Sequence, residues 1–183
     1  TLRSSSAASD VYKRQQWHGA METVDGAGTG LDILVNNAGI SPHDNAESFD
    51  LDEFRRIHGI VLEGVALGCK HGLALLKASP AGAIVNMSSV AGLIGVSGYL
   101  SYGSAKAGVH NLSKSVAMLC AERGYAVRCN SIHPGTIDTP ILDADKAKYG
   151  ERAVTAREKL IPLGRLGRAE EVANAVLFLA SDE

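Results

Sequence analysis

The stretch Ile84–Lys106, IVNMSSVAGLIGVSGYLSYGSAK, decides the fold prediction for this chain. It begins as an apolar, β-branched run of the kind found in buried strands. Polar and small residues, Asn86 to Ser89, then end the strand, and a glycine-rich loop follows. After the loop, the sequence pattern predicts a helix from about Tyr99 to Arg123, closed by Gly124. A buried strand followed by a loop and a helix is typical of a parallel α/β sheet.

The same pattern recurs on both sides of this stretch. Two more short runs, Leu31–Val35 and Val127–Ile132, are predicted to be strands. Helical periodicity covers about Phe49–Lys77, with Asp50 or Ser48 as its cap, and a last helix is predicted over Ala169–Ala180. The alternation predicts an α/β fold, a doubly wound parallel sheet in three αβα layers.

Three segments need a separate interpretation. Residues 1–15 lack apolar periodicity, so we expect a disordered or foreign arm ahead of one partial domain over residues 16–183. Gly26–Gly30 is glycine-rich but precedes a strand, which favours a helix-to-strand turn over a dinucleotide fingerprint. Residues 136–168 are a long excursion, with a short helix predicted near Asp145–Leu160.

Composition limits the classes of function. The 183 residues carry a net charge of −2 and 45% hydrophobic residues, which suits one domain and gives no reason to expect nucleic acid or an anionic membrane as partner. No apolar run suggests a bilayer span and no secretory plan is present, so we expect a cytoplasmic protein. The three scattered cysteines are predicted to be reduced thiols. The six histidines lack ligand spacing, so no metal site is predicted.

Tyr102 and Lys106 are four residues apart, so both lie on one face of the predicted helix. A tyrosine has a pKa of about 10, and a nearby ammonium is expected to lower that pKa and make the phenol a usable acid or base. Ser89 could bond the same substrate oxygen. This set suits carbonyl reduction or alcohol oxidation, with the hydride supplied by a cofactor. A Tyr/Lys pair alone more often lies on an exposed helix surface without any catalytic role. The preceding strand, serines and glycine-rich loop favour the catalytic interpretation here.

Five motifs together resemble the short-chain dehydrogenase/reductase family. The resemblance covers about Gln16 to Glu183, in matching order and spacing. The motifs are LDILVNNAG at 31–39, IVNMSS at 84–89, YGSAK at 102–106, VRCNSIHPGTIDTP at 127–140 and PLGRLGRAEEVANAVLFLASD at 162–182.

The resemblance implies a Rossmann-like fold and an NAD(P)-dependent oxidoreductase that interconverts a secondary alcohol and a ketone. It implies Tyr102 as the general acid/base, Lys106 as the residue that tunes it and binds the nicotinamide ribose, and Ser89, rather than Ser88, as the residue that orients substrate. The remaining residues implied to bind NAD or NADP, with a mild preference for NAD, are Asn36, Ala38, Gly39, Pro134, Gly135, Ile137 and Thr139. A homodimer or homotetramer is also implied.

The resemblance also shows departures. Val61 stands where the family usually has an asparagine that supports a water relay to the lysine. Valine cannot hydrogen-bond, so a relay here would depend on water held by a backbone carbonyl. The family's glycine-rich phosphate loop, first strands and last strand have no counterpart. We therefore expect a fragment that is poorly stable alone and binds dinucleotide weakly.

Alternatives remain at this stage. A catalytically silent Rossmann-like binding or scaffold protein would fit Val61 and the missing loop, but it has no need of Ser89, Tyr102 and Lys106. A serine hydrolase is disfavoured because no G-x-S-x-G elbow occurs. The substrate is expected to be a hydrophobic alcohol or ketone, because apolar residues lie near the predicted site; these residues could equally pack against each other. They are Leu93, Ile94, Val96, Ile137, Ile141 and Leu142.

Overall fold

The computed structural model describes residues 14–28, 30–143, 146–147 and 150–182. Most of the predicted arm, residues 1–13, lies outside the described residues. Its last two residues, Arg14 and Gln15, belong to the first helix, α1 (Arg14–Gly26). A glycine turn follows α1, with Gly28 and Gly30 at φ of 67° and 68°. Glycine occupies this left-handed region without strain, and the predicted helix-to-strand turn is confirmed.

The central sheet contains three parallel strands, β1 (Ile33–Asn36), β2 (Gly82–Met87) and β3 (Val127–Ile132), in the order β1-β2-β3. Asn36 pairs with Asn86, and Met87 pairs with Ile132, so the strands end at nearly the same level. The three predicted strands are confirmed to within two residues. A second parallel pair, β4 (Ile137–Asp138) with β5 (Gly167–Arg168), was not predicted, because two residues are too few to show a period.

One long helical segment follows β1, as predicted, but it changes winding on the way. α2 (Leu51–His58) leads into a π-helical turn, Gly59–Glu63, and then into α3 (Gly64–Leu76). Of the two predicted caps, Asp50 is the one used, since its carboxylate accepts from the backbone N–H groups of Asp52 and Glu53. The π-turn gives the helix one wider turn beside the sheet.

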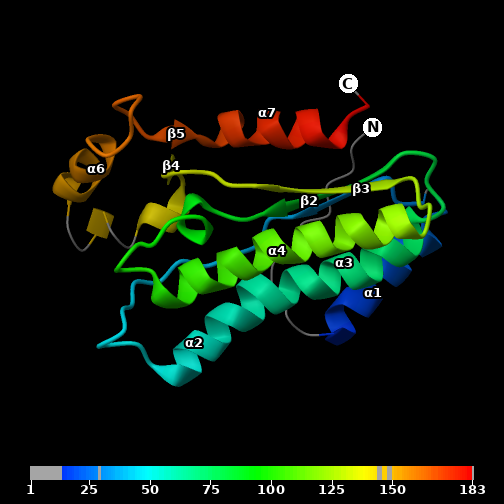
Figure 1. Cartoon of the computed structure of the whole chain (residues 1–183), viewed down its shortest axis with the longest axis horizontal. Coiled ribbons are helices and arrows are strands. Elements are labelled where there is room, and N and C mark those ends of the chain that lie inside the picture. The colour runs from blue at the N-terminus through cyan, green and yellow to red at the C-terminus, as the bar shows by residue number, and fades with distance from the viewer. Residues whose placement is uncertain (1–13, 29, 144–145, 148–149, 183) are drawn as a thin grey trace.

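The other helices are α4 (Leu100–Glu122), α6 (Glu151–Glu158) and α7 (Ala169–Ala180), with 3-10 turns at Val90–Gly92 and Pro140–Leu142. In Figure 1, α1, α3 and α4 lie on one face of the sheet and α7 lies on the other. The predicted three-layer, doubly wound α/β fold is therefore confirmed. The β4–β5 pair and α6 lie beyond the ends of β2 and β3 (Figure 1).

The segment Leu51–Leu76 corrects one expectation from sequence. Its length, and a mean hydropathy of 1.4 over one 18-residue window, are sufficient for a membrane span, although the sequence suggested no such run. Half of the apolar window is buried inside the structure. Ile57, Val61 and Leu76 are fully buried in the core, so the apolar character of this helix is explained by packing against the sheet and α4.

Candidate active site

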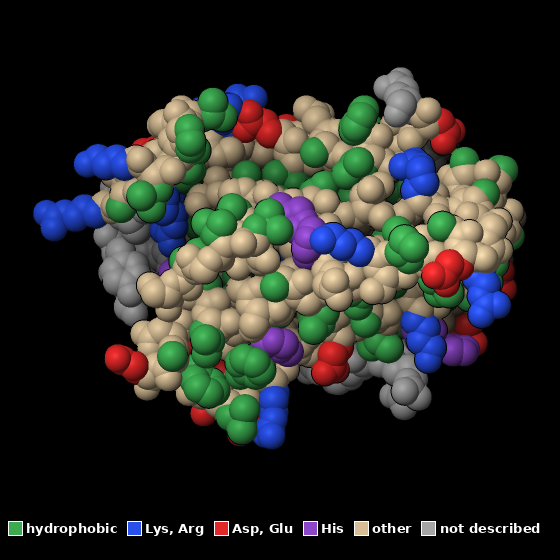
Figure 2. Space-filling model, in the orientation of Figure 1, with side chains coloured by type: hydrophobic (Ala, Val, Ile, Leu, Met, Phe, Trp, Pro, Cys, Tyr) green, Lys and Arg blue, Asp and Glu red, His purple; other side chains and the backbone are tan. Residues whose placement is uncertain are grey.

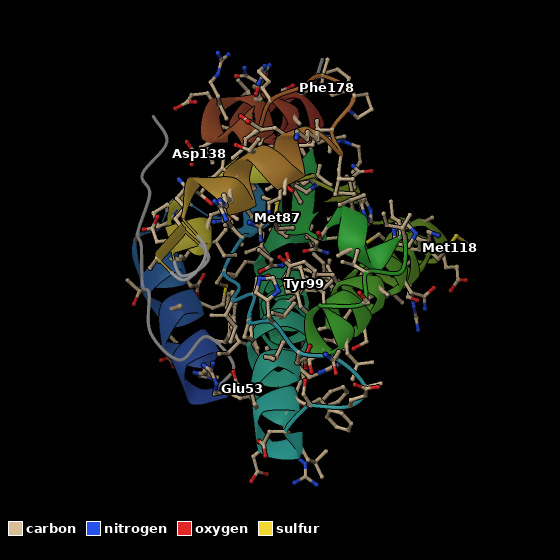
Figure 3. All side chains as sticks on the ribbon, turned by 90° about the vertical axis from the view of Figure 1, so that its left-hand side faces the viewer. Glu53, Met87, Tyr99, Met118, Asp138 and Phe178 are labelled. Carbon is tan, nitrogen blue, oxygen red and sulfur yellow. The ribbon has the colours of Figure 1, made fainter. Side chains whose placement is uncertain are left out.

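The site lies at the carboxyl edge of the sheet, where the loops after the three strands meet. The loop after β2 is fastened to β3 and the loop beyond it, because Ser88 N donates to Ile132 O at 2.9 Å and Val90 N donates to Pro134 O at 3.0 Å. Figure 3 looks onto this edge, with Met87 and Tyr99 near its middle and Asp138 towards α7. In parallel α/β sheets this edge is where ligands bind.

Tyr102 and Ser89 meet at this edge. Tyr102 lies in the first turn of α4, and Ser89 caps the 3-10 turn after β2 by accepting a bond from Ala91 N at 3.2 Å. The Ser89 side chain lies close to the Tyr102 hydroxyl. Burial raises the pKa of Tyr102, and the neighbouring Ser89 side chain only partly offsets this. The phenol is therefore protonated near neutral pH.

Lys106 is one helical turn further along α4 and is almost completely buried, at 3% exposure. Its Nζ donates to the Met87 carbonyl oxygen at 2.5 Å and lies 5.6 Å from the centre of the Tyr102 ring. Burial lowers the pKa of Lys106 to about 8. The expected lowering of the Tyr102 pKa by this ammonium is wrong for the structure, because desolvation of the phenol dominates.

The two adjacent serines have different partners. Ser88 Oγ donates to the Lys106 carbonyl oxygen at 2.8 Å, so its hydroxyl joins β2 to α4 and is only 2% exposed. Ser89 Oγ instead accepts from Ala91 N at 3.2 Å and lies close to Tyr102, so its own proton is not committed to the backbone. The geometry agrees with the preference for Ser89 over Ser88, since the Ser88 proton is already committed to the backbone.

The proposed cofactor residues divide between the edge and the interior. The Asn36 side chain is 5% exposed and lies between the sheet and α3, where Nδ2 donates to Asn86 Oδ1 at 2.8 Å. Any contact from Asn36 to a ligand would therefore come from its backbone. Ala38 and Gly39, by contrast, are exposed in the loop after β1. A Cβ on Gly39 would lie 3.6 Å from Lys106 Nζ, so this loop passes directly beside the lysine.

The remaining predicted residues lie after β3. Pro134 and Thr139 are half-buried, Gly135 is exposed, and Ile137 belongs to β4. Pro134 reaches the loop that contains Ser89 through its bond from Val90 N. The structure thus brings the loops after β1, β2 and β3 to one edge, while Ile137 and Thr139 extend from it towards α6.

A cavity of about 400 Å³ lies in the excursion after β3, near α6. Its walls carry a mixture of charged and apolar residues, namely Asp138, Lys146, Val154, Glu158, Arg165, Leu166, Gly167 and Arg168. Ser89, Tyr102 and Lys106 do not line it. The apolar residues that were expected near the substrate differ in their exposure. Leu93, Ile94 and Ile141 are exposed, whereas Leu142 is buried.

Asp44 is a supporting residue that sequence reasoning missed. The N-cap residue of α4, Tyr99, makes no side-chain capping bond. Instead, the Asp44 carboxylate accepts from Ser101 N at 3.1 Å and from the Ser101 hydroxyl. The loop after β1 therefore caps the helix that contains Tyr102. The only sequence signal was negative, since a tyrosine is a poor helix cap.

Val61 lies in the π-turn and is fully buried. Its Cγ2 lies 4.0 Å from the Cβ position of Gly39, whose other neighbour is Lys106 Nζ. The valine and the lysine thus both lie beside Gly39, and the valine presents only methyl groups where the family resemblance implied a polar side chain.

Comparisons with known proteins identify the family. The family model described as enoyl-(acyl carrier protein) reductase matches residues 2–183. The chain is 41% identical, over 95% of its own length, to trans-4-hydroxycyclohexanecarboxylate dehydrogenase of Sinomonas cyclohexanicum, and spans 62% of that relative. It is 38% identical to 3-beta-hydroxysteroid dehydrogenase of Comamonas testosteroni, covering 95% of this chain and 68% of that protein.

Solved structures agree. Ligand-free aldohexose dehydrogenase of Thermoplasma acidophilum matches with a TM-score of 0.87 at 32% identity, covering 94% of this chain and 69% of that one. A structure titled ElxO with NADP bound matches with a TM-score of 0.87 at 31% identity, covering 96% of this chain and 70% of that one. Sequence, fold and the arrangement at the carboxyl edge all lead to the conclusion that this chain belongs to the short-chain dehydrogenase/reductase family.

Proposed function

We propose that the protein containing this chain is an NAD(P)-dependent oxidoreductase that interconverts a secondary alcohol and a ketone by hydride transfer. The observation that carries this proposal is the pair of neighbouring hydroxyls, Tyr102 and Ser89, with the buried Lys106 Nζ 5.6 Å from the centre of the Tyr102 ring. One substrate oxygen can be bonded by both hydroxyls, and one of them can exchange a proton with it.

In this proposal Tyr102 is the general acid of carbonyl reduction. Its raised pKa keeps the phenol protonated near neutral pH, so a proton is available when negative charge develops on the substrate oxygen. Ser89 holds the same oxygen and fixes its distance from Tyr102. Lys106, on the inner side, places a positive charge close to the ring, which stabilises the phenolate that forms after transfer.

The edge around these residues fits a nicotinamide cofactor, which supplies the hydride when bound. Gly39 leaves room beside Lys106 Nζ, and among the described residues, the chain neighbours of Gly135 apart, no atom lies within 4 Å of the position that a Cβ of Gly135 would take. Ala38 and Gly39 on one side and Pro134 and Gly135 on the other would hold the cofactor through their backbones, with Ile137 and Thr139 further along. NAD should be tested first and NADP beside it, because one relative is named as NADP-dependent.

The substrate class we propose is a hydrophobic secondary alcohol, alicyclic in shape. Leu93, Ile94 and Ile141 are 55%, 58% and 46% exposed, so their side chains are available to line an apolar site. The named relatives include a cyclohexanol dehydrogenase and hydroxysteroid dehydrogenases, whose names describe ring-borne hydroxyls.

We further propose a cytoplasmic homodimer or homotetramer. Met118 and Leu119, on α4, are 60% and 40% exposed, and a second copy would cover them. Figure 2 shows hydrophobic side chains at separate places on the viewed face, interspersed with basic and acidic ones. Analytical ultracentrifugation of the purified protein tests this, and a concentration-independent monomer would reject it.

The catalytic proposal is tested with the gene product that contains these residues. Reduction of cyclohexanone and of a ketosteroid is followed by oxidation of NADH or NADPH. Tyr102→Phe should lower kcat by about 10²- to 10⁴-fold, because it removes the transferable proton. Tyr125→Phe is the matched control, since Tyr125 contacts Lys77 rather than the site. Turnover that survives Tyr102→Phe at the wild-type rate would reject the proposal.

The second candidate, a catalytically silent binding protein, is favoured by Val61 and by the missing phosphate loop. It predicts dinucleotide binding in calorimetry without turnover of any alcohol or ketone in the panel. Val61→Asn would then separate an enzyme that lacks only the water relay from a protein without catalysis. The added amide should raise turnover in the enzyme and leave the silent protein inactive.

A further inference from the structure

A pair of histidines, His110 and His133, contacts the backbone of Ser89. His133 follows β3, and its Nδ1 lies 3.3 Å from the Ser89 carbonyl oxygen. Its other nitrogen, Nε2, lies 3.0 Å from His110 Nδ1 and 3.0 Å from Ser131 Oγ. The two rings meet edge-on, with centroids 4.7 Å apart. The loop after β2, the end of β3 and the middle of α4 are thereby joined.

The partners fix the proton positions. A carbonyl oxygen only accepts, so His133 must carry its proton on Nδ1 to bond Ser89. In the neutral ring Nε2 then accepts, and both His110 Nδ1–H and the Ser131 hydroxyl are suited to donate to it. Burial, followed by the charge of Lys114 and by His133, lowers the pKa of His110. The neutral form that this donor chain requires is therefore favoured.

The Ser89 carbonyl accepts two bonds. Gly92 N donates to it at 3.0 Å, which closes the 3-10 turn, and His133 Nδ1 approaches as the second donor. The local bond fixes the shape of the turn, whereas the bond from His133 fixes its position relative to β3. Because Ser89 Oγ belongs to the same residue, its direction towards Tyr102 depends on that peptide plane.

We propose that His133, held in its Nδ1–H form by His110 and Ser131, is a positioning residue that fixes the Ser89 peptide and so aims the Ser89 hydroxyl at Tyr102 and the substrate oxygen. This inference rests on the proposed function for its catalytic consequence. Its structural content, the tautomer and the bond to Ser89, stands independently of turnover.

The first experiment reads the tautomer without any reaction. Long-range ¹H–¹⁵N correlation spectra of the ¹⁵N-labelled gene product that contains these residues report which nitrogen of each histidine is protonated, and His133→Gln assigns the His133 signals. The expected result at neutral pH is a neutral His133 with the proton on Nδ1. A proton on Nε2 would overturn the inference, whether or not the protein is an enzyme.

The second experiment uses a matched pair of variants in the active gene product. In His133→Asn the amide nitrogen replaces Nδ1, and in His133→Gln it replaces Nε2. His133→Asn should retain kcat within a few-fold, while His133→Gln should lower kcat by about tenfold with little change in KM, the loss of one hydrogen bond in the transition state. Equal kcat values for the two variants would refute a role through Ser89.

A double-mutant cycle separates positioning from folding. In a Ser89→Ala background no hydroxyl remains to be aimed, so His133→Gln should cause no further loss of kcat. An undiminished loss in that background would show that His133 supports the fold rather than Ser89. If the wild-type protein turns over no substrate at all, the proposed function fails, and the tautomer measurement still decides the inference.

Discussion

On one face of the three-stranded sheet, the helical segment α2–α3 and α4 enclose a core of thirteen buried residues among those described, whereas on the other face α7 encloses three. Two consecutive residues of β2 show the contrast, since Ile84 points to the first face and Val85 to the second. Val35, on β1, is 40% exposed on the α7 side. The residues proposed for catalysis belong to the densely packed face, where α4 has least freedom to move.

The difference in packing between the two faces is tested most directly at Ile84. Ile84→Ala removes a fully buried side chain from the larger core and should lower the free energy of unfolding by about 2–5 kcal/mol. Urea unfolding followed by circular dichroism measures this. Val35→Ala is the control on the opposite face and should cost less than about 0.5 kcal/mol, because the side chain is already partly in water. Similar losses for the two variants would show that both faces are packed alike.

The second prediction uses Lys106, the charge enclosed by that dense face. Its folded pKa of about 8 lies below the usual 10.5, so the unfolded chain binds more protons between these values and stability should rise with pH there. The full difference between the folded and unfolded pKa of Lys106 corresponds to on the order of 3 kcal/mol. Below pH 8 the lysine is charged in both states, so the folded protein bears the whole cost of burying that charge. The raised pKa of Tyr102 acts in the opposite direction above about pH 10.

Denaturant unfolding of the wild type and of Lys106→Met between pH 7 and 10 isolates the lysine from the thiols, which also titrate. Above pH 8, the free energy of unfolding of the wild type should rise with pH relative to that of Lys106→Met. Parallel curves would indicate that Lys106 is solvated rather than enclosed.

The third prediction tests how closely the loop after β2 approaches α4. A Cβ on Gly92 would lie 2.7 Å from the Lys106 carbonyl carbon and 2.8 Å from Ala107 N, both backbone atoms. Gly92→Ala should therefore displace the loop from the helix, lower the free energy of unfolding by about 1–3 kcal/mol and reduce kcat. Gly95→Ala is the control, because nothing lies within 4 Å of that position. Equal stability of the two variants would contradict the close approach.

The smallest effect concerns the cap on α4. Asp44→Ala should lower the free energy of unfolding by about 1 kcal/mol, the usual value of a helix cap, and Asp44→Asn should lose less because its oxygen still accepts from Ser101 N. Asp52→Ala provides the control, since Asp52 forms a solvent-exposed ion pair with Arg55, and such pairs contribute little to stability. If Asp44→Ala matched Asp52→Ala in thermal unfolding, the cap would have no energetic role.

The fold could be predicted, and Ser89, Tyr102 and Lys106 could be selected as catalytic candidates, because both leave local patterns. Apolar runs of strand length, one long helical period and the i, i+4 spacing of Tyr102 and Lys106 require no knowledge of distant contacts. Asp44 and His133 could not be predicted, since their partners lie far away in sequence and no period links them. The raised Tyr102 pKa was missed for a related reason: a charge can be seen in a sequence, but the degree of desolvation cannot.

The π-turn at Gly59–Glu63 has a consequence for how this helix tolerates insertion and deletion. The π-turn places one extra residue within nearly the same rotation as an α-helical turn. One residue removed here would therefore restore the α-helical winding and leave α2 in nearly the same phase relative to α3, so that His58 would still face Ser104, which it bonds at 3.2 Å. One residue removed within α2 or α3 would instead rotate the two parts of the helix against each other by about 100°, and should be far more damaging than a deletion in the π-turn.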